Sequence, residues 1–352
     1  MTNIVALNII TNFSLDELNT LGVPATAGNY VKVTTKAELK EALKLAKELN
    51  LRVLVLGGGS NVVLPELFVG LVIHINIKGI ELVHETNDVA WLRVGAGEVW
   101  QDLVDYCLNF HYWGLENLSL IPGTVGAAPI QNIGAYGVEL KDVFVELKAV
   151  ECNSMLDVTF TAEGCQFGYR DSVFKQHLKD LYIITDVTLK LNKHPKVNVE
   201  YPALKSTCEH LSPAEITPVK VSQLVSDIRR SKLPDPKRVP NAGSFFKNPF
   251  VSSEKYRELQ ERFPDIVAYP VASSDDSNGC NMKLAAGWLL EKSGWKGRID
   301  HGIGMHSQQA LVLINEGHRA SRHIIDFAQQ VQRSVDDMFG VMLEIEPRVY
   351  LD

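Results

Sequence analysis

Ser119-Leu-Ile-Pro-Gly-Thr-Val-Gly-Ala-Ala-Pro-Ile-Gln-Asn-Ile-Gly-Ala-Tyr-Gly137 is the most informative segment of this sequence. It holds four glycines and no charged side chain, and it follows neither a helical nor a strand period. Such a segment is rarely an exposed linker, and glycine lets a backbone approach a flat ligand closely. Because the N–H and C=O groups of a buried irregular loop need partners, a large cofactor with polar ring edges would suit it. A packed Ω-loop without a ligand is the alternative.

The composition predicts a soluble protein with ample core material. The chain has 352 residues, 45% of them hydrophobic, which is enough for about two to three domains. Its net charge of -7 argues against general binding to nucleic acids or anionic membranes. One local stretch, from Arg229 to Lys247, is nevertheless basic, which favours an anionic small molecule over a polymer.

Cysteine, histidine and hydropathy patterns exclude several classes of protein. The five cysteines are scattered without a C-x-x-C pair, so neither a zinc ribbon nor a disulfide framework is indicated. The histidines form no H-E-x-x-H, and His301 and His306, which bracket a glycine turn, are weak metal candidates. The N-terminus lacks the basic flank of a signal peptide, and no apolar run reaches about 18 residues. We therefore expect a cytoplasmic protein without a metal.

An α/β unit is predicted near the N-terminus. Thr35-Lys-Ala-Glu38 is a capping box that opens a helix. A strand over 52–56 then runs into Gly57-Gly-Gly-Ser-Asn61, and a second strand follows over 70–75. A glycine turn at the carboxyl end of a strand is where α/β sheets tend to bind ligands. This one is neither G-x-G-x-x-G nor a Walker A loop, so its N–H groups either bind a phosphate or simply form a turn.

The rest of the chain reads as a sheet-rich middle followed by mixed helices and strands. We expect strands over 80–84, 89–94, 143–152, 157–160 and 182–191, and a helix that begins near Trp100. The proline-containing stretch 195–218 reads as a crossing segment or boundary. Beyond it we expect helices over 219–231, 253–263, 283–293 and 319–339, and strands over 310–314 and 341–350.

Two further segments carry residues that could do chemistry, besides Gly168-Tyr-Arg-Asp171 and Gln308-Gln309. In Asn241-Ala-Gly-Ser-Phe-Phe-Lys-Asn-Pro249, the Ser244 hydroxyl follows a glycine and could stand exposed; a loop serine before a core Phe pair is the alternative. In Leu343-Glu-Ile-Glu-Pro-Arg348, period 2 places three polar side chains on one face. Taken alone, this pattern is more typical of a solvated face with a cross-strand ion pair.

In combination, these motifs resemble a known family. The two glycine segments, Gly168-Tyr-Arg-Asp-Ser172, Asn241–Pro249 and the terminal Glu346 closely resemble UDP-N-acetylenolpyruvoylglucosamine reductases, flavoenzymes that complete UDP-N-acetylmuramate in bacterial peptidoglycan synthesis. The resemblance runs in order over about 14–350. It implies an α+β or α/β fold, with a two-subdomain FAD-binding module of the p-cresol methylhydroxylase type and a C-terminal α/β substrate-binding domain. We expect these at 1–78, 79–218 and 219–352.

The resemblance also implies ligands and binding residues: non-covalent FAD, with NADPH as co-substrate and a UDP-sugar enolpyruvate as substrate. The residues that match FAD-binding positions are Gly57, Gly58, Gly59, Ser60, Asn61, Pro122, Gly123, Thr124, Gly126, Ala127, Gln131, Asn132, Ile133 and Gly134. Those that match substrate-binding positions are Tyr169, Tyr201, Arg230, Lys232, Asn248, Lys296 and Gln309. Tyr201 resembles the aromatic of a loop that the longer subclass moves over the substrate diphosphate. We expect a monomer that binds neither nucleic acid nor membrane.

Three residues match catalytic positions of the family. Hydride delivered to the terminal carbon of an enolpyruvyl C=C pushes charge into the conjugated carboxylate. The resemblance places Arg170 and Glu346 at that carboxylate and Ser244 as proton donor to the adjacent carbon. Arg170 would stabilise the growing charge. We expect Glu346 to be protonated there, or to reach the enolate through a hydrogen bond, because an ionised carboxylate would repel the substrate.

The sequence departs from the family pattern in a few places. Pro347 stands where a valine is usual, so we expect an edge or irregular strand there. Pro202-Ala203 replaces the usual Gly-Asp after Tyr201, which would stiffen that loop. The segment Val271–Met282 looks like a long surface loop without a function.

Two other functions remain open. An oxidase of the same FAD fold often tethers flavin through His or Cys, and neither glycine segment contains one. A non-catalytic sensor of UDP-sugars would have lost the chemistry, yet Arg170, Ser244 and Glu346 are present. A generic Rossmann dehydrogenase lacks its fingerprint here.

Overall fold

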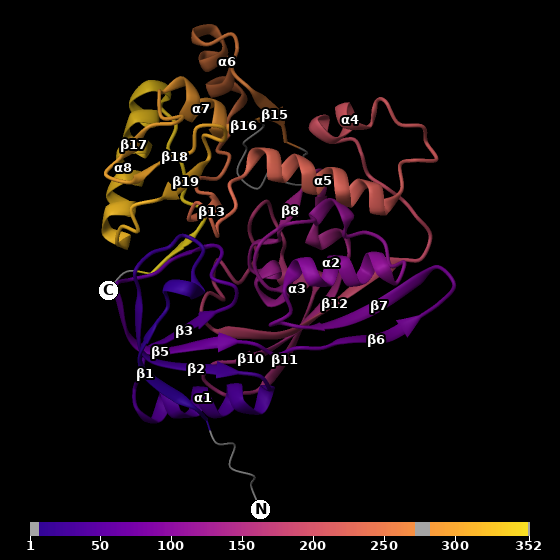
Figure 1. Ribbon diagram of the computed structural model, residues 1–352, viewed down its shortest axis with the longest axis vertical. Coiled ribbons are helices and arrows are strands. Elements are labelled where there is room, and N and C mark those ends of the chain that lie inside the picture. The colour runs from indigo at the N-terminus through magenta and orange to yellow at the C-terminus, as the bar shows by residue number, and fades with distance from the viewer. Residues whose placement is uncertain (1–6, 272–281, 351–352) are drawn as a thin grey trace, which may run out of the picture. The chain divides into compact units, whose positions relative to one another are not determined.

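The computed structural model describes residues 7–271 and 282–350 (Figure 1). The chain forms two units that each have their own core. The first consists of Met1–Phe13, Ala27–Gly58 and Phe68–Ser231, and the second of Ser14–Thr26, Gly59–Leu67 and Lys232–Asp352. The segment 271–282, expected to be a surface loop, lies outside the described residues except at its two ends.

The first unit contains a four-stranded sheet in the order β1-β2-β5-β3. Its strands are β1 (Ile9–Ser14), β2 (Thr26–Val33), β3 (Val53–Leu56) and β5 (Leu67–Ile75), and β3 pairs with β5 in parallel. Helix α1 (Lys36–Glu48) begins at the predicted capping box, in which Thr35 and Glu38 each accept the other's backbone N–H. One face of α1 packs against the sheet through Leu39, Ala42, Leu43 and Ala46. The predicted α/β unit is confirmed, with the glycine turn at the carboxyl end of β3.

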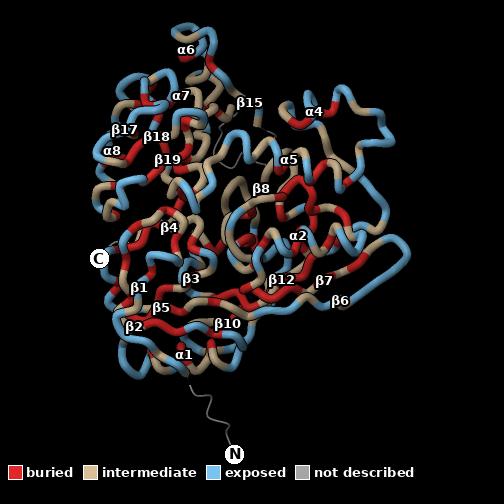
Figure 2. Tube along the Cα trace, in the orientation of Figure 1, coloured by how far each residue is buried: buried red, intermediate tan, exposed pale blue. Residues whose placement is uncertain are grey.

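A five-stranded antiparallel sheet forms the rest of this unit's framework, in the order β11-β10-β12-β7-β6. Its strands are β6 (Ile80–Glu85), β7 (Val89–Gly95), β10 (Phe144–Glu151), β11 (Asp157–Thr161) and β12 (Tyr182–Asn192). All five predicted strands are thus confirmed, as is the helix α2 (Trp100–Asn109). Figure 2 shows the buried residues concentrated along β7 and β12, whereas β6 is largely exposed. A short helix, α3 (Ala162–Cys165), follows β11.

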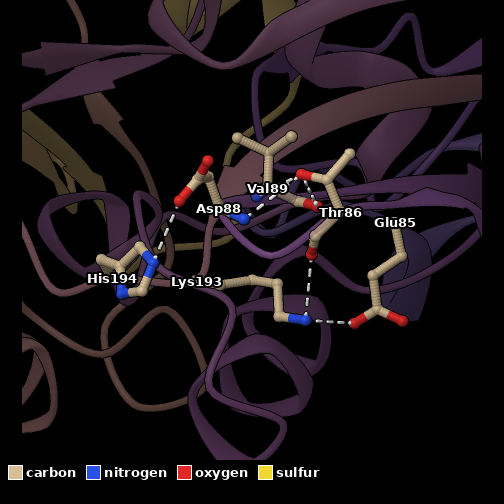
Figure 3. Close-up of polar contacts among 6 residues, drawn as sticks. All are labelled: Glu85, Thr86, Asp88, Val89, Lys193 and His194. Atoms are coloured by element: carbon tan, nitrogen blue, oxygen red, sulfur yellow. Dashed lines mark hydrogen bonds and ion pairs between the residues drawn. The ribbon is translucent and has the colours of Figure 1, made fainter.

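The turn between β6 and β7 is tied to the end of β12 by polar contacts (Figure 3). Lys193 Nζ lies 2.8 Å from Glu85 Oε1 and donates to the Thr86 carbonyl at 3.1 Å. His194 Nε2 lies 3.2 Å from Asp88 Oδ1. Exposed ion pairs of this kind contribute little to stability, so they mainly fix the position of the turn.

The glycine-rich segment 119–137 contains more regular structure than its sequence predicts. It forms the 3₁₀ helix η3 (Val125–Gln131) and the strand β8 (Gly134–Ala135), which pairs with β9 (Val138–Glu139). The absence of a helical period is explained by the short i→i+3 geometry of η3, which contains Pro129 and ends at Asn132 in the left-handed region. The short helices η2 (Glu116–Leu118) and η4 (Leu140–Asp142) flank the segment.

The first unit ends in two helices, α4 (Pro202–Cys208) and α5 (Pro218–Lys232). The helix predicted over 219–231 is confirmed as α5. The stretch 195–218, expected to be a crossing segment, contains the additional helix α4, which starts with Pro202 at a position where a missing N–H costs nothing. Leu204, Cys208, Val221 and Val225 form a small core between these helices.

The second unit contains a four-stranded sheet in the order β13-β19-β18-β17 and a three-stranded sheet in the order β14-β16-β15. The strands are β13 (Asn241–Ser244), β14 (Phe250–Val251), β15 (Ala268–Pro270), β16 (Met282–Leu284), β17 (Ile299–Asp300), β18 (Ile303–Met305) and β19 (Val312–Asn315). Three helices accompany them: α6 (Ser253–Arg262), α7 (Ala286–Lys292) and α8 (Ser321–Phe339). Near the start of this unit lie η1 (Asp16–Leu18) and β4 (Val62–Val63).

Two predictions for this unit were correct only in part. The helix expected over 283–293 begins only at Ala286, because Met282–Leu284 pairs as β16 with β14 and β15. The strand expected over 341–350 is reduced to β20 (Arg348–Val349), which pairs in parallel with β4, and an isolated bridge at Ile345. Pro347 lies in a bend between them and has no N–H to continue a ladder, so the expected irregularity at this proline is confirmed.

None of the helices within residues 7–271 and 282–350 combines the length and the hydrophobicity that crossing a bilayer requires.

Candidate active site

In the first unit, the glycine turn after β3 lies directly against the start of the glycine-rich segment. A Cβ added to Gly58 would lie 3.0 Å from the Gly123 Cα, and one added to Gly57 would lie 2.6 Å from Thr124 Oγ1. Real Cβ atoms rarely come so close to other atoms. The two backbones therefore meet at a distance that only glycine allows at this turn.

This contact gathers backbone N–H groups that have no partner. No acceptor among the described residues pairs with the N–H groups of Gly57, Gly58, Gly123 or Thr124. Gly58 is exposed and the other three are half-buried, so a ligand can reach them. Clustered N–H groups of this kind bind phosphate oxygens. The residues present thus fit a pyrophosphate such as that of FAD.

The second half of the turn belongs to the second unit and is held there. Gly59 has φ +59°, and a Cβ on it would lie 1.8 Å from the Leu18 carbonyl oxygen. Its own carbonyl accepts the Thr20 N–H at 3.0 Å, and the Asn61 carbonyl accepts the Arg348 N–H at 2.9 Å. Ser60 and Asn61 are half-buried.

The remaining candidate flavin residues are held by contacts within the first unit. Gly126 donates its N–H to Ala96 at 2.9 Å, and a Cβ on it would lie 2.5 Å from the Ala96 Cβ. The fully buried Asn132 side chain donates to Glu139 Oε2 at 3.0 Å and to the Gly168 carbonyl at 3.1 Å, and accepts the Lys141 N–H at 3.0 Å. Ile133 and Gly134 are buried, Gln131 is half-buried, and Pro122 and Ala127 are exposed.

Arg170 lies on a tight turn that is fastened to the glycine-rich segment. Its Nη2 donates to the Gly134 carbonyl at 2.6 Å, and its guanidinium lies 5.6 Å from the centre of the Tyr169 ring. Ser172 Oγ donates to the Ile130 carbonyl at 2.7 Å. Arg170 itself has φ +53°. A residue other than glycine costs about 1 kcal/mol or more in this left-handed backbone conformation. Such strain is common at functional sites, where a side chain must be held in one direction.

Tyr201 lies at the start of α4 and packs edge-to-face on Tyr136, with ring centres 5.2 Å apart. The segment before it is tied to the glycine-rich segment by two asparagines. Asn117 Nδ2 donates to the carbonyls of Tyr136 and Asn198, both at 2.8 Å, and Asn198 Nδ2 donates to the Gly137 carbonyl at 3.1 Å. Asn117 precedes the glycine-rich segment, and Tyr136 lies within it but was not selected as a binding residue, so the sequence did not reveal this role for either residue.

Helix α5 presents its two adjacent arginines differently. Arg230 is exposed and pairs with Asp227 at 3.4 Å. Arg229 points its Nε atom into the protein, where it has no hydrogen-bond partner among the described residues. Burial lowers the pKa of the Arg229 guanidinium; the Tyr136 phenol raises it and the charge of Arg170 lowers it.

In the second unit, the structure brings Ser244 close to the segment that carries Glu346. Ser244 ends β13, follows Gly243 with φ +72°, and pairs with Val312. The next residue, Phe245, accepts the Glu346 N–H at 2.9 Å. Phe246 and Ile345 form an antiparallel bridge. Ser244 and Glu346 are both half-buried, while Phe245 is fully buried, so both interpretations of Ser244 from the sequence hold in part.

The other substrate candidates in this unit lie mainly around α7. Asn248 Oδ1 accepts the N–H of Ala286, the first residue of α7, at 2.9 Å. A Cβ on Gly287 would lie 3.8 Å from Gln309 Oε1, so Gln309 reaches the same end of the helix. Lys296 is exposed and lies 2.9 Å from Glu291, and Lys232 is exposed at the end of α5.

No group of three His, Cys, Asp or Glu side chains is arranged to hold a metal within the described part of the chain. His301 is exposed, with its ring 3.6 Å from Asp300. Cys107, Cys152, Cys165 and Cys208 are free thiols.

The class of protein follows from comparison with known families. Residues 27–156 match the family model of an FAD binding domain, and residues 235–350 match that of the C-terminal domain of UDP-N-acetylenolpyruvoylglucosamine reductase. The chain is therefore an FAD-dependent oxidoreductase, and its mixed helix and strand content confirms the predicted fold class.

Relatives over the full length identify the family. The chain is 45% identical over 343 residues to UDP-N-acetylenolpyruvoylglucosamine reductase of Amoebophilus asiaticus, covering 97% of this chain and 99% of the relative. It is 43% identical to that of Pseudomonas aeruginosa, covering 98% and 100%. The crystal structure of the enzyme from Thermus caldophilus shares the fold, with a TM-score of 0.67 and 23% identity over 98% of this chain and 99% of that one. The chain belongs to the UDP-N-acetylenolpyruvoylglucosamine reductase family.

Proposed function

We propose that this chain reduces the enolpyruvyl group of UDP-N-acetylglucosamine enolpyruvate with NADPH, giving UDP-N-acetylmuramate for peptidoglycan synthesis. The observation that carries the proposal is the backbone contact between Gly57-Gly58 and Gly123-Thr124, with its unpartnered N–H groups, inside the residues that match an FAD binding domain.

Non-covalent FAD, when bound, would supply the redox chemistry, the relay of a hydride from NADPH to the substrate. Gly57, Gly58, Gly123 and Thr124 would hold its pyrophosphate, continued by Gly59, Ser60, Asn61 and Pro122. Gly126, Ala127 and residues 131–134 would line its ring. Neither segment contains the His or Cys that a covalent link would need.

Three residues act on the enolpyruvyl group. Hydride adds to the terminal carbon, and the C=C electron pair moves toward the carboxylate. The Arg170 guanidinium, fixed by Gly134, stabilises that charge. The Ser244 hydroxyl then gives its proton to the adjacent carbon, completing the CH–CH₃ unit, and regains one from water. A serine is a weak acid, so this step requires a strongly basic carbanion held close to the hydroxyl.

Glu346 assists beside Ser244, either as a neutral carboxyl or through a hydrogen bond to the enolate. The backbone bond between Glu346 and Phe245 supports a joint role for these two residues. Tyr169, Tyr201, Arg230, Lys232, Asn248, Lys296 and Gln309 would bind the rest of the UDP-sugar, the lysines by charge-assisted hydrogen bonds to phosphate.

The same proposal includes the division into FAD-binding parts at 1–78 and 79–218 and a substrate-binding part at 219–352. We also propose that the protein acts in the cytoplasm as a monomer and binds neither nucleic acid nor membrane. The acidic net charge of -7 supports the last point.

An anaerobic experiment with the purified flavin-bound protein tests the function. NADPH should bleach the flavin absorbance, and the enolpyruvyl substrate should restore it, whereas UDP-N-acetylglucosamine should not. Acid precipitation should release the flavin. If oxygen, but not the enolpyruvyl substrate, reoxidised the flavin, the protein would be an oxidase; a flavin that neither NADPH nor substrate affects would indicate a sensor.

A further inference from the structure

The segment 193–201, which leads into α4, is fastened at both of its ends. At the first end, the Lys193 N–H donates to the Asp88 carbonyl at 2.8 Å, and the His194 ring lies 3.2 Å from the Asp88 carboxylate (Figure 3). At the second end, Tyr201 packs edge-to-face on Tyr136 of the glycine-rich segment. Because the segment is irregular, its course depends on the partners that its polar groups find.

Between these ends, the sequence Val197-Asn198-Val199 places an amide between two apolar side chains. Both valines pack against the small core between α4 and α5. The Asn198 Nδ2 atom donates to the Gly137 carbonyl at 3.1 Å, and its Oδ1 atom accepts the Glu200 N–H at 3.1 Å. One side chain therefore joins this segment to the glycine-rich segment and also fixes the backbone just before Tyr201.

Asn117 supports the same junction from inside the protein. It is only 1% exposed, and its Nδ2 atom donates to the carbonyls of Tyr136 and Asn198, both at 2.8 Å. An amide nitrogen has two hydrogens to donate, so both are used here. The carbonyl of Tyr136 belongs to a residue with φ +48°, a backbone conformation that persists only where its surroundings hold it. Asn117 thus fixes the two segments against each other.

The junction lies in the part of the glycine-rich segment that also holds Arg170. Arg170 donates to the Gly134 carbonyl, two residues before Tyr136. The ring of Tyr201 lies 5.2 Å from that of Tyr136, and Tyr201 is 43% exposed, so a ligand can contact it. Fixing residues 197–201 therefore fixes Tyr201 beside residues assigned to the reaction.

We propose that Asn198 and Asn117 are positioning residues that hold Tyr201 in place for the diphosphate of the UDP-sugar. This inference rests on the proposed function, in which Tyr201 contacts that diphosphate. A segment that is already held in the binding arrangement does not have to be ordered when the substrate binds. A segment that has been released lowers the apparent affinity by the fraction of molecules in which it is correctly placed.

Steady-state kinetics of the flavin-bound variants tests the proposal. Asn198→Ala should raise the KM for the enolpyruvyl substrate about 10-fold, the effect of losing one or two hydrogen bonds, and leave kcat nearly unchanged. In a Tyr201→Ala background the same substitution should barely change KM, because Asn198 acts through Tyr201. Asn109→Ala, at an exposed asparagine that ends α2, should match the wild type. An equal rise of KM in both backgrounds, or a lower KM for Asn198→Ala, would overturn the proposal.

Cleavage by trypsin reports on the segment without substrate or turnover. Lys196 is exposed within the segment, and cleavage after it requires the segment to leave its docked position. In the flavin-bound protein, Asn198→Ala should raise the rate of this cleavage about 10-fold, whereas Asn109→Ala should not change it. Mass spectrometry of the fragments identifies the site. An unchanged rate would show that the Asn198 amide does not hold the segment.

The outcomes separate this inference from the proposed function. A wild type that does not reduce the enolpyruvyl substrate would contradict the function itself. A wild type that reduces it, with Asn198→Ala keeping the wild-type KM, would overturn the inference alone. If Asn198→Ala did not fold, Asn198→Ser would replace it. Its hydroxyl can still accept the Glu200 N–H but is too short to reach the Gly137 carbonyl, so the same rise of KM is expected and an unchanged KM contradicts the proposal.

Discussion

At the scale of single residues, Ser244 illustrates how a weak acid can be positioned by its surroundings. It ends a strand, follows a glycine with φ +72°, and precedes two phenylalanines that are buried in the core. These neighbours fix its backbone, while its own side chain stays partly accessible. The hydroxyl is therefore held in place, and proximity can compensate for its low acidity.

Ser244→Ala should leave flavin reduction by NADPH nearly unchanged but slow reoxidation by the enolpyruvyl substrate by about 10²- to 10⁴-fold, because only the second half-reaction needs the proton. Stopped-flow absorbance measures both rates separately. Ser334→Ala, on α8 in the same unit, serves as the matched control. Equal slowing of the two half-reactions would show that Ser244 is not the proton donor.

Glu116 is a buried residue whose charge state links stability to pH. It lies in η2, and its Oε2 accepts the Gly114 N–H at 2.7 Å. Burial raises the pKa of its carboxyl, although backbone hydrogen bonds lower it in part. Between the unfolded pKa, about 4.3, and the higher folded pKa, the folded state holds a proton that the unfolded state has lost. This contribution to stability is thus lost as pH rises through that window.

Glu116→Gln removes the titration and retains an oxygen for the Gly114 N–H. The melting temperature of the variant relative to wild type should therefore be higher at pH 8 than at pH 5. Circular dichroism at the two pH values measures the difference, with the exposed Glu209→Gln as control. A difference that is independent of pH would mean that Glu116 does not titrate differently on folding.

At the scale of elements, the glycine-rich segment depends on close backbone contacts to β7 and the turn after it. Gly126 bonds to Ala96, which directly follows β7, and leaves no room for a Cβ. The atoms that a Cβ on Gly126 would meet are the backbone and the Cβ of the buried Ala96. They cannot move aside, so η3 itself would have to shift.

Gly126→Ala should therefore displace η3 and weaken FAD binding, giving protein with a reduced flavin-to-protein absorbance ratio and a melting temperature lower by several degrees. Gly164→Ala is the matched control, since a Cβ on that glycine would meet its nearest neighbour at 3.7 Å. Retention of full flavin content by Gly126→Ala would show that η3 tolerates the shift.

Local sequence patterns predicted most helices and strands. The errors arose where the strands that pair with a segment are distant from it in sequence. The capping box of α1 and the alternation of β7 are encoded within a few residues. By contrast, Met282–Leu284 is extended only because β14 and β15 pair with it.

The same distinction holds for the site. Its glycine motifs are visible in the sequence, but the proximity of Ser244 to Glu346 depends on pairing between strands about a hundred residues apart, at Phe246 and Ile345. In Arg229-Arg230 the sequence shows two equivalent cations. Only the packing of α5 reveals that Arg229 is half-buried, with an inaccessible Nε atom, whereas Arg230 is exposed.

At the scale of the whole molecule, the second unit is not continuous in sequence. Its core includes Leu21, Val23 and Val63, all fully buried, beside residues beyond 240. Asn315 Nδ2 donates to the Leu21 carbonyl at 3.0 Å, and β20 pairs with β4. Two short N-terminal segments therefore complete a unit that is otherwise C-terminal.

A fragment consisting of 232–352 alone should fail to fold, because it lacks these apolar side chains and the partner of β20. Urea titration followed by tryptophan fluorescence should show no cooperative transition. A chain in which 14–26 and 59–67 are joined to 232–352 by short Gly-Ser linkers should recover one. A cooperative transition of the fragment on its own would contradict this account.

The divided second unit also constrains how the protein can be made and how it can evolve. During synthesis, segments 14–26 and 59–67 are made well before residues 232–352, so the second unit can be completed only after those later residues have left the ribosome. The C-terminal part cannot be exchanged as a cassette between related genes unless the two early segments change with it. Recombination within this lineage should therefore keep the coding regions of 14–26, 59–67 and 232–352 together.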